Sequence, residues 1–70
     1  MVDQASKREL SLVVPCFDEE LNIPELTERV LRTFEAGKLN GELVLVDDGS
    51  RDGTARVIRE KMRQHPDVVA

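Results

Sequence analysis

The chain has 70 residues, a formal net charge of −4 and a single cysteine, Cys16. This length allows at most one small domain, and one cysteine excludes an intrachain disulfide. The ten basic residues are scattered among fourteen acidic ones, so no basic stripe is available for a phosphate backbone and we expect no nucleic-acid partner. No apolar run approaches the roughly 18 residues of a membrane span, and the polar first nine residues do not resemble a signal peptide.

The first predicted element is a strand over Leu10–Val14, whose residues are mostly apolar and β-branched toward its end. We expect the charged residues 1–9 before it to be a flexible lead-in. Pro15 ends the strand because proline has no N–H group for a sheet ladder. The loop that follows carries three consecutive acids (18–20), where a dinucleotide-binding turn would have glycines. A NAD-type binding motif is therefore absent.

A helix is predicted next, because Asn22 is a favourable N-cap and Glu25, three residues on, suits the reciprocal position of a capping box. The apolar residues of this helix recur at spacings of three and four, so they form one stripe that needs a sheet to cover it. The stripe consists of Ile23, Leu26, Val30, Leu31 and Phe34.

The second predicted strand is the apolar run Leu43–Val46, which lies between Gly41 and Gly49. Four consecutive apolar residues are typical of a parallel strand covered on both faces, since a half-exposed strand would alternate. The run stops at two carboxylates, Asp47 and Asp48. Open parallel sheets bind their ligands at this end of the strands. An acidic turn that merely caps the next helix is the structural alternative.

A second helix is predicted to begin near Thr54, with Ser50 or Asp52 as its N-cap, and to end before Pro66. Its inward residues are expected to be Val57, Ile58 and Met62. The apolar residues after Pro66 predict the start of a third strand. The order β-α-β-α-β predicts an α/β fold with a parallel sheet and right-handed crossovers, formed by residues 10–70.

Right-handed crossovers make the strands parallel, so the acidic loops 15–20 and 47–53 must emerge at one edge of the sheet. Carboxylates gathered there repel one another unless hydrogen-bond donors, a metal or a ligand offset the repulsion. A ribose hydroxyl or a base N–H group can donate to a carboxylate, whereas phosphates need an accompanying cation. The sequence therefore favours the nucleoside end of a nucleotide as the ligand.

Two segments resemble the family 2 glycosyltransferases of the GT-A fold, particularly those that act on polyprenyl phosphates such as dolichol or undecaprenol phosphate. The segment LVVPCFDEELNIPEL (12–26) is similar to the family pattern VVPxYNEExNIxxL, and VDDGSRDGT (46–54) is similar to VDDGSxDGT. The resemblance implies that the chain is the truncated N-terminal portion of a Rossmann-like domain that binds a nucleotide-sugar. It implies that the nucleotide is held by Pro15, Phe17, Glu19, Val46 and Asp48.

The same resemblance implies an activity for the full-length protein, which would transfer a sugar from a nucleotide-sugar to a lipid phosphate or a saccharide. The reaction would take place at the cytoplasmic face of the membrane, with Mg²⁺ or Mn²⁺ on the diphosphate. The family's metal-binding D-x-D and its catalytic base lie beyond residue 70. We therefore expect no catalytic residue, no metal ligand and no transferase activity in the 70-residue chain alone.

The chain departs from the family pattern at two neighbouring positions. Phe17 stands where the family usually has tyrosine, so the ring face is kept for stacking and the hydroxyl group is lost. Asp18 stands where the family usually has asparagine and adds a negative charge to an acidic site. Cys16, just before them, is expected to be a packed side chain rather than a nucleophile, because no histidine is near it in the sequence.

Other classes of protein share parts of this pattern. A receiver domain carries its acidic pair after the first strand rather than the second, and a calcium-binding loop needs a bidentate glutamate where this chain has Arg59. A non-catalytic α/β module that acts by self-association stays open as the alternative function. It is suggested by Leu10–Val14, an apolar strand expected at the sheet edge, and by a core that rarely supplies more than about 3–5 kcal/mol without a staple. We therefore expect a homo-oligomer.

Overall fold

The computed structural model describes residues 8–70, which form three strands and two helices in alternation. The elements are β1 (Leu10–Cys16), α1 (Ile23–Ala36), β2 (Gly41–Asp47), α2 (Thr54–Gln64) and β3 (Val68–Val69). The strands form one parallel sheet in the order β1-β2-β3. The predicted α/β fold and its element order are confirmed. The prediction that Pro15 ends the first strand is wrong, because β1 continues through Pro15 to Cys16; proline is tolerated in an edge strand, and β1 lies at the edge of the described sheet.

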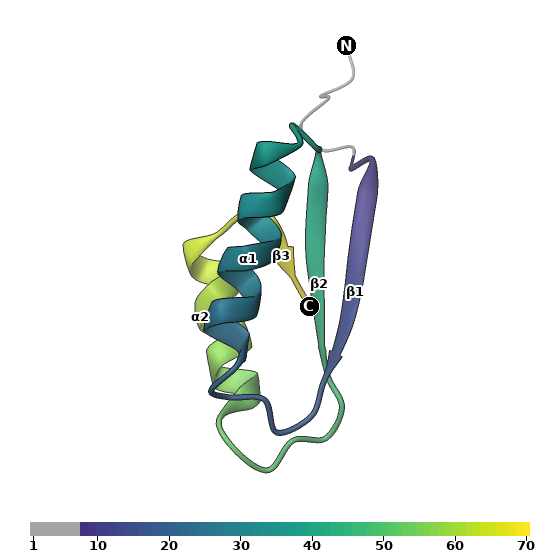
Figure 1. The fold of residues 1–70 in the computed structure, drawn as a ribbon. Coiled ribbons are helices and arrows are strands. Elements are labelled where there is room, and N and C mark those ends of the chain that lie inside the picture. Colours follow the sequence, from purple (N-terminus) through teal and green to yellow (C-terminus); the bar gives the residue numbers. More distant parts are fainter. Residues whose placement is uncertain (1–7) are drawn as a thin grey trace.

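Both helices lie on the same side of the sheet (Figure 1), so within residues 8–70 the other face of the sheet has no cover. Successive side chains of a strand point to opposite faces. In β2, Leu43 and Leu45 are fully buried, whereas Val44 is half-buried and Val46 is exposed. The expectation that this strand is covered on both faces is therefore wrong for the part of the chain that the structure describes.

The core lies between the helices and the covered face of the sheet. The predicted stripe of α1 is confirmed, since Ile23 and Phe34 are buried and the apolar residues between them pack against the core. In α2, Val57 and Ile58 are buried as predicted, but Met62 is 39% exposed, so its prediction as an inward residue is wrong.

The start of α1 differs from the capping box that the sequence predicts. Asn22 is the N-cap residue, but its side chain does not cap the helix; its amide group donates instead to Glu19 Oε1 at 2.6 Å. At α2 the N-cap residue is Gly53. The prediction that Ser50 or Asp52 is the N-cap is therefore wrong. Asp52, one residue before Gly53, still bonds to the start of the helix, because it accepts a hydrogen bond from the N–H group of Thr54 at 2.9 Å.

The expected lead-in covers residues 1–9, of which residues 1–7 lie outside the described part of the chain. The remaining two, Arg8 and Glu9, are both hydrogen-bonded to residues at the start of β2 or just before it. The Arg8 guanidinium pairs with Asp67 at 2.6 Å and donates to the carbonyl oxygen of Gly41 at 3.3 Å. The N–H group of Glu9 donates to the carbonyl oxygen of Asn40 at 2.8 Å. These contacts join the starts of β1, β2 and β3 at the end of the sheet opposite the acidic loops.

Candidate functional site at the carboxyl edge of the sheet

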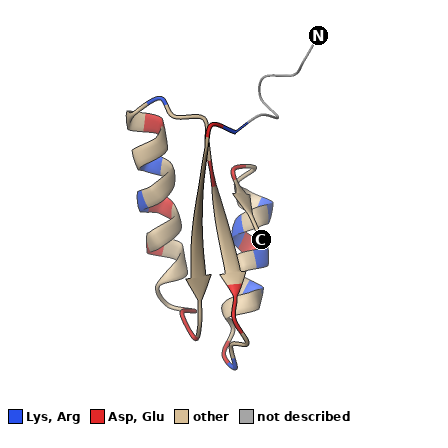
Figure 2. Cartoon of the chain, turned by 90° about the vertical axis from the view of Figure 1, so that its right-hand side faces the viewer, with Lys and Arg blue, Asp and Glu red and all other residues tan. Residues whose placement is uncertain are grey.

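The parallel register brings two loops to the same edge of the sheet, as the sequence predicts. The β1–β2 pairing ends with Cys16 opposite Asp47, and the N–H group of Asp48 donates to the carbonyl oxygen of Cys16 at 2.8 Å. The first loop (17–22) and the second loop (48–53) therefore leave the sheet side by side (Figure 1). Figure 2 shows acidic segments in red at the ends of both strands.

The five residues predicted to hold a nucleotide lie at the ends of β1 and β2 and in the loops that follow. Pro15 and Val46 are partners in the β1–β2 register. Pro15 and Glu19 both line a shallow hollow of about 180 Å³ beside β1. Phe17 is 56% exposed and Val46 is 43% exposed, so neither side chain is used in the core. Asp48 is exposed too, and its main chain is tied to β1 as described.

Hydrogen bonds between side chains and main chain fasten the two loops together. Three consecutive N–H groups of the first loop donate to side-chain oxygens of the second loop or of the first residue of α2. The pairs are Asp18 N to Ser50 Oγ (2.8 Å), Glu19 N to Thr54 Oγ1 (2.9 Å) and Glu20 N to Asp52 Oδ2 (3.3 Å). The loops are thus held together over three successive residues.

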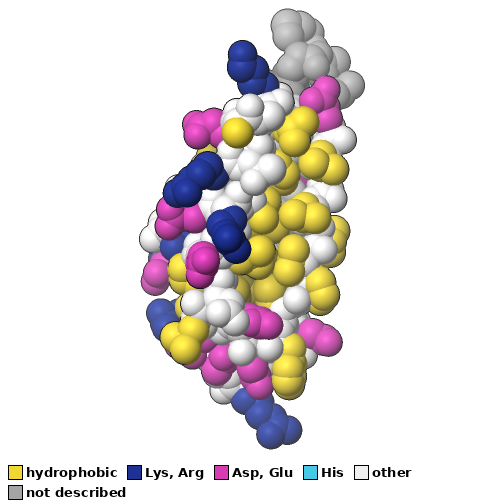
Figure 3. Space-filling view, in the orientation of Figure 1, with side chains coloured by type: hydrophobic (Ala, Val, Ile, Leu, Met, Phe, Trp, Pro, Cys, Tyr) yellow, Lys and Arg dark blue, Asp and Glu magenta, His cyan; other side chains and the backbone are white. Residues whose placement is uncertain are grey.

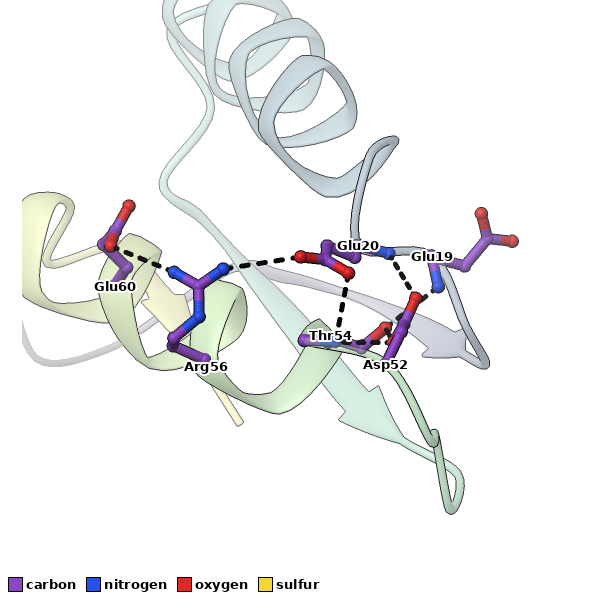
Figure 4. A network of polar contacts seen from close by, with 7 residues as sticks. Glu19, Glu20, Asp52, Thr54, Arg56 and Glu60 are labelled. Carbon is purple, nitrogen blue, oxygen red and sulfur yellow. Dashed lines mark hydrogen bonds and ion pairs between the residues drawn. The ribbon is translucent and has the colours of Figure 1, made fainter.

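The fastening is reciprocal, because side chains of the first loop accept from the main chain of the second. Asp18 Oδ1 accepts from the N–H group of Arg51 at 2.9 Å, and Glu20 Oε1 accepts from that of Gly53 at 3.1 Å. Figure 4 shows how Glu20 extends the network from Asp52 to Arg56. The Arg56 guanidinium lies 3.4 Å from the Glu20 carboxylate and 3.8 Å from that of Glu60.

Two glycines permit this arrangement. Gly49 has φ of +77°, a left-handed conformation that glycine adopts without steric cost. Gly53 lies so close to Glu20 that a Cβ atom there would be 2.7 Å from Glu20 Oε2. A side chain at residue 53 would therefore push Glu20 away from the main chain of the second loop.

The contacts divide the acidic residues at this edge into two groups. The carboxylates of Asp18, Glu20, Asp47 and Asp52 each accept a hydrogen bond from a main-chain N–H group. Such bonds stabilise the charged form of a carboxylate. Hydrogen-bond donors of the protein's own main chain therefore offset part of the repulsion that the sequence predicts at this edge.

Asp48 is the exception among these acids. Within residues 8–70 its carboxylate has no hydrogen-bond or ion-pair partner, whereas the Glu19 carboxylate accepts from the side-chain amide of Asn22. In Figure 4 the Glu19 carboxylate points away from the network around Glu20. The Asp48 carboxylate is therefore available to accept a hydrogen bond from a ligand. Asp48 lies one residue after the end of β2, and its N–H group is bonded to Cys16 at the end of β1.

Two side chains at this edge have shifted pKa values. The hydroxyl group of Thr54 donates to Asp52 and, together with main-chain N–H groups, lowers the pKa of that carboxyl group. Burial, followed by the charges of Glu19 and Asp47, raises the pKa of the Cys16 thiol. Cys16 is 1% exposed and its Sγ atom lies 3.6 Å from the carbonyl oxygen of Val14. A buried thiol with a raised pKa is a packed side chain, in agreement with the prediction.

The hydrogen bonds that Asp18, Ser50 and Thr54 make between the two loops are not among the predictions from the sequence. There Asp18 is an added charge, and Ser50 is a possible N-cap. A signal was present, because Asp, Ser and Thr in loops commonly bond to main-chain N–H groups. When two such loops follow neighbouring parallel strands, these bonds can form between the loops as well as within each one.

A comparison with known proteins identifies the class to which this edge belongs. Residues 11–69 match the model of the family described as "Glycosyl transferase family 2". The match covers most of the chain, and the chain belongs to this family. The resemblance seen in the two sequence segments is confirmed.

Two curated relatives illustrate which proteins the chain is similar to. The chain is 43% identical over 58 residues to "Undecaprenyl-phosphate 4-deoxy-4-formamido-L-arabinose transferase" of Shewanella sediminis; the matched region covers 83% of this chain and 17% of that protein. It is 48% identical over 52 residues to "Dodecaprenyl-phosphate galacturonate synthase" of Rhizobium johnstonii; here the matched region covers 74% of this chain and 15% of that protein. The chain thus spans about one sixth of the length of these curated relatives.

Proposed function

We propose that the carboxyl edge of this sheet binds the nucleoside part of a nucleotide-sugar. The observation that carries the proposal is the Asp48 carboxylate, which has no protein partner within residues 8–70 and lies at the same edge as the exposed ring of Phe17. The carboxylate accepts hydrogen bonds from ribose hydroxyl groups, and the ring stacks on the base. Pro15, Glu19 and Val46 line the same edge and complete the proposed pocket.

We propose further that the full-length protein transfers the sugar to a polyprenyl phosphate. This is supported by the family and by the printed names of the two relatives, both of which refer to a polyprenyl phosphate. The lipid acceptor places the reaction at a membrane, for which we propose the cytoplasmic face. Among the helices of residues 8–70, none is long and apolar enough to cross a membrane.

A divalent cation, Mg²⁺ or Mn²⁺, is proposed for the diphosphate of the donor, because phosphates would otherwise be repelled by the acidic edge. The described residues do not fit the role of its ligands, since residues 8–70 contain no group of three or more His, Cys, Asp or Glu side chains that could hold a metal ion. The cation ligands and the catalytic base are therefore proposed to lie beyond residue 70, and the residues described here contribute only the binding of the nucleoside.

The binding proposal can be tested directly on the 70-residue chain by NMR. Titration with uridine, guanosine, cytidine and adenosine diphosphates should shift the amide signals of residues 17–22 and 48–53 for at least one of them. Ribose 5-phosphate, which lacks the base, should cause much smaller shifts. If none of the four nucleoside diphosphates shifts these signals while the chain is folded, the proposed site is wrong.

Self-association is the second proposal for this chain. It is favoured by β1, which within the described sheet pairs only with β2 and leaves Leu12 and Val13 exposed by 40% and 57%. An exposed apolar edge strand is a template for pairing with another chain. This proposal does not exclude nucleoside binding, because the edge of β1 and the ends of the strands are different surfaces.

A further inference from the structure

We propose that Asp18 and Ser50 are positioning residues, which hold Phe17 and Asp48 at a fixed separation for the nucleoside. The inference rests on the proposed function and extends it to residues for which the sequence suggested only a charge or a helix cap. Asp18 and Ser50, with the hydrogen bonds that join them to the opposite loop, are called the loop clasp below.

The loop clasp consists of two hydrogen bonds that run in opposite directions between the loop tips. The N–H group of Asp18 donates to Ser50 Oγ at 2.8 Å, and the carboxylate of Asp18 accepts from the N–H group of Arg51 at 2.9 Å. Ser50 is itself oriented by Asp47, whose Oδ1 atom accepts from the N–H group of Ser50 at 3.0 Å. Each tip thus fixes the other.

Both proposed ligand-binding residues lie close to the loop clasp, beside the hydrogen bond that joins the ends of β1 and β2. Phe17 has Cys16 on one side, whose carbonyl oxygen accepts from the Asp48 main chain, and Asp18 on the other. Because the Phe17 side chain is 56% exposed, core packing does not fix its position. The main-chain bonds on both sides of Phe17 therefore fix its backbone, and with it the point from which its ring extends, relative to Asp48.

The backbone of Asp18 gives independent support for a special role. Asp18 has φ of +51°, a left-handed conformation that is unfavourable for most residues but is adopted by aspartate, asparagine and glycine. The turn at Asp18 therefore needs a residue that tolerates this conformation and also carries a side-chain acceptor. Asparagine satisfies both requirements without the charge, whereas glycine satisfies only the first.

The rest of the network is separate enough to keep the fold when the loop clasp is broken. Glu20 and Asp52 join the loops nearer to the helices, through Gly53 and Thr54. Both bonds of the loop clasp are exposed to solvent, and the hydrophobic core does not include Asp18 or Ser50. Loss of the loop clasp should therefore loosen the tips and leave the sheet and helices intact.

Three variants distinguish an effect of the loop-clasp hydrogen bonds from an effect of the charge of Asp18. Ser50→Ala removes the acceptor for the Asp18 main chain, and Asp18→Gly removes the acceptor for Arg51 while keeping the left-handed turn. Asp18→Asn removes the same charge as Asp18→Gly but keeps the acceptor. Ser11→Ala is the matched control for Ser50→Ala, since Ser11 Oγ donates to Glu42 at 2.6 Å in an exposed pair at the other end of the sheet.

Two measurements are made on each variant of the 70-residue chain. One is the affinity for the nucleoside diphosphate to which the unchanged chain responds most strongly among those of uridine, guanosine, cytidine and adenosine. The other needs no ligand and follows the hydrogen exchange and order parameters of the Phe17 and Asp48 amide groups. Thermal unfolding followed by circular dichroism shows whether each variant keeps its fold.

We expect Ser50→Ala to weaken binding about fivefold and Asp18→Gly about tenfold, the worth of one hydrogen bond expressed as an affinity. Asp18→Asn and Ser11→Ala should stay within about twofold of the unchanged chain. The amide groups of Phe17 and Asp48 should become more mobile in Ser50→Ala and Asp18→Gly only.

Unchanged affinity and unchanged mobility in folded Ser50→Ala and Asp18→Gly would overturn the positioning role and leave the proposed function intact. Equal losses in Asp18→Asn and Asp18→Gly would overturn it too, because the charge of Asp18 would then be what matters. If the unchanged chain binds none of the four nucleoside diphosphates, the proposed function fails, and the ligand-free mobility of Phe17 and Asp48 alone decides whether the clasp holds the loop tips.

Discussion

The acidic side chains at the carboxyl edge of the sheet have different tasks, although the sequence places them in two similar loops. Asp18, Glu20, Asp47 and Asp52 are engaged with main-chain N–H groups, and Glu19 is engaged with Asn22. Asp48 alone among them, within residues 8–70, has a carboxylate without a protein partner. Removal of its charge should therefore affect a ligand more than the fold.

Asp48→Asn tests this assignment. We expect the variant to lose about 1.5–3 kcal/mol of nucleoside diphosphate binding, the contribution of hydrogen bonds to a charged group. Isothermal titration calorimetry measures the affinity, and the unfolding midpoint should stay close to that of the unchanged chain. Glu35→Gln, on the exposed surface of α1, is the control because it changes the net charge equally at a distance from the loops. Equal affinity in both variants would show that Asp48 does not contact the ligand.

The residues of the candidate site could be predicted from the sequence only in part. The position of Asp48 and Phe17 at strand ends and the family pattern predict that they contact the nucleoside, and this stays a prediction. The hydrogen bonds of Asp18 and Ser50 were not predicted, because their partners lie 32 and 33 residues away along the chain. Which loop amide meets which side chain depends on the register of β1 and β2, and the sequence does not specify that register residue by residue.

The helices and strands themselves followed closely from local patterns. The spacing of apolar residues in α1 identified its buried face, and the apolar run ending at Asp47 identified β2. The predictions were wrong where contacts outside the local segment determine the burial or the hydrogen-bond partner of a side chain. Val46 is exposed because one face of the sheet has no helix over it within residues 8–70, and Met62 is exposed although its spacing predicts an inward position. Asn22 bonds to Glu19 because the preceding loop brings that carboxylate within reach.

The start of α2 should respond to acid through Asp52. The hydrogen bonds from Thr54 lower the pKa of this carboxyl group, so its charged form stabilises the folded state. That contribution is present above the ordinary aspartate pKa of about 3.9 and is lost as the pH falls through the lower folded-state value. In Asp52→Asn the contribution is absent at every pH.

Urea unfolding of the unchanged chain and of Asp52→Asn at pH 7 and pH 3 checks this expectation. The difference in stability between the two should be largest at pH 7 and should shrink toward pH 3, because below a pH of about 3.9 the Asp52 carboxyl group takes up a proton in the unfolded chain before it does so in the folded one. A difference that is constant over this range would mean that the charge of Asp52 is not what stabilises the start of α2. Glu35→Gln again serves as a control for the change in net charge.

For the molecule as a whole, we predict that the 70-residue chain alone has no transferase activity. The described residues include the proposed nucleoside site but no group of three or more side chains that could hold a cation on the diphosphate, and polarisation of the diphosphate by a metal is a major part of such catalysis. Incubation with a nucleotide-sugar, Mn²⁺ and undecaprenyl phosphate should release no nucleotide above background. Release that depends on the chain and is lost in Asp48→Asn would show that a catalytic group had been overlooked.

The outer side of β1 carries exposed apolar side chains, among them Leu12 and Val13. Figure 3 shows hydrophobic side chains gathered in a strip between α1 and β1. Part of this strip is a hollow of about 250 Å³ lined by Leu12, Val30 and Phe34, with Arg29 and Thr33 at its border. A second copy that paired with the edge of β1 would place its own apolar side chains against this strip, and a core of this size gains from the added burial.

We therefore predict that the chain forms a dimer or a larger assembly through β1. Sedimentation over a wide concentration range should show association, and Val13→Lys should reduce it, because a charged residue on an edge strand opposes pairing with another chain. Val13 is exposed, so this change should leave the fold intact. Met62→Lys, at another exposed apolar residue on α2, should leave association unchanged. A monomer at the highest concentration, with cooperative thermal unfolding, would show that the edge of β1 is already protected in the single chain.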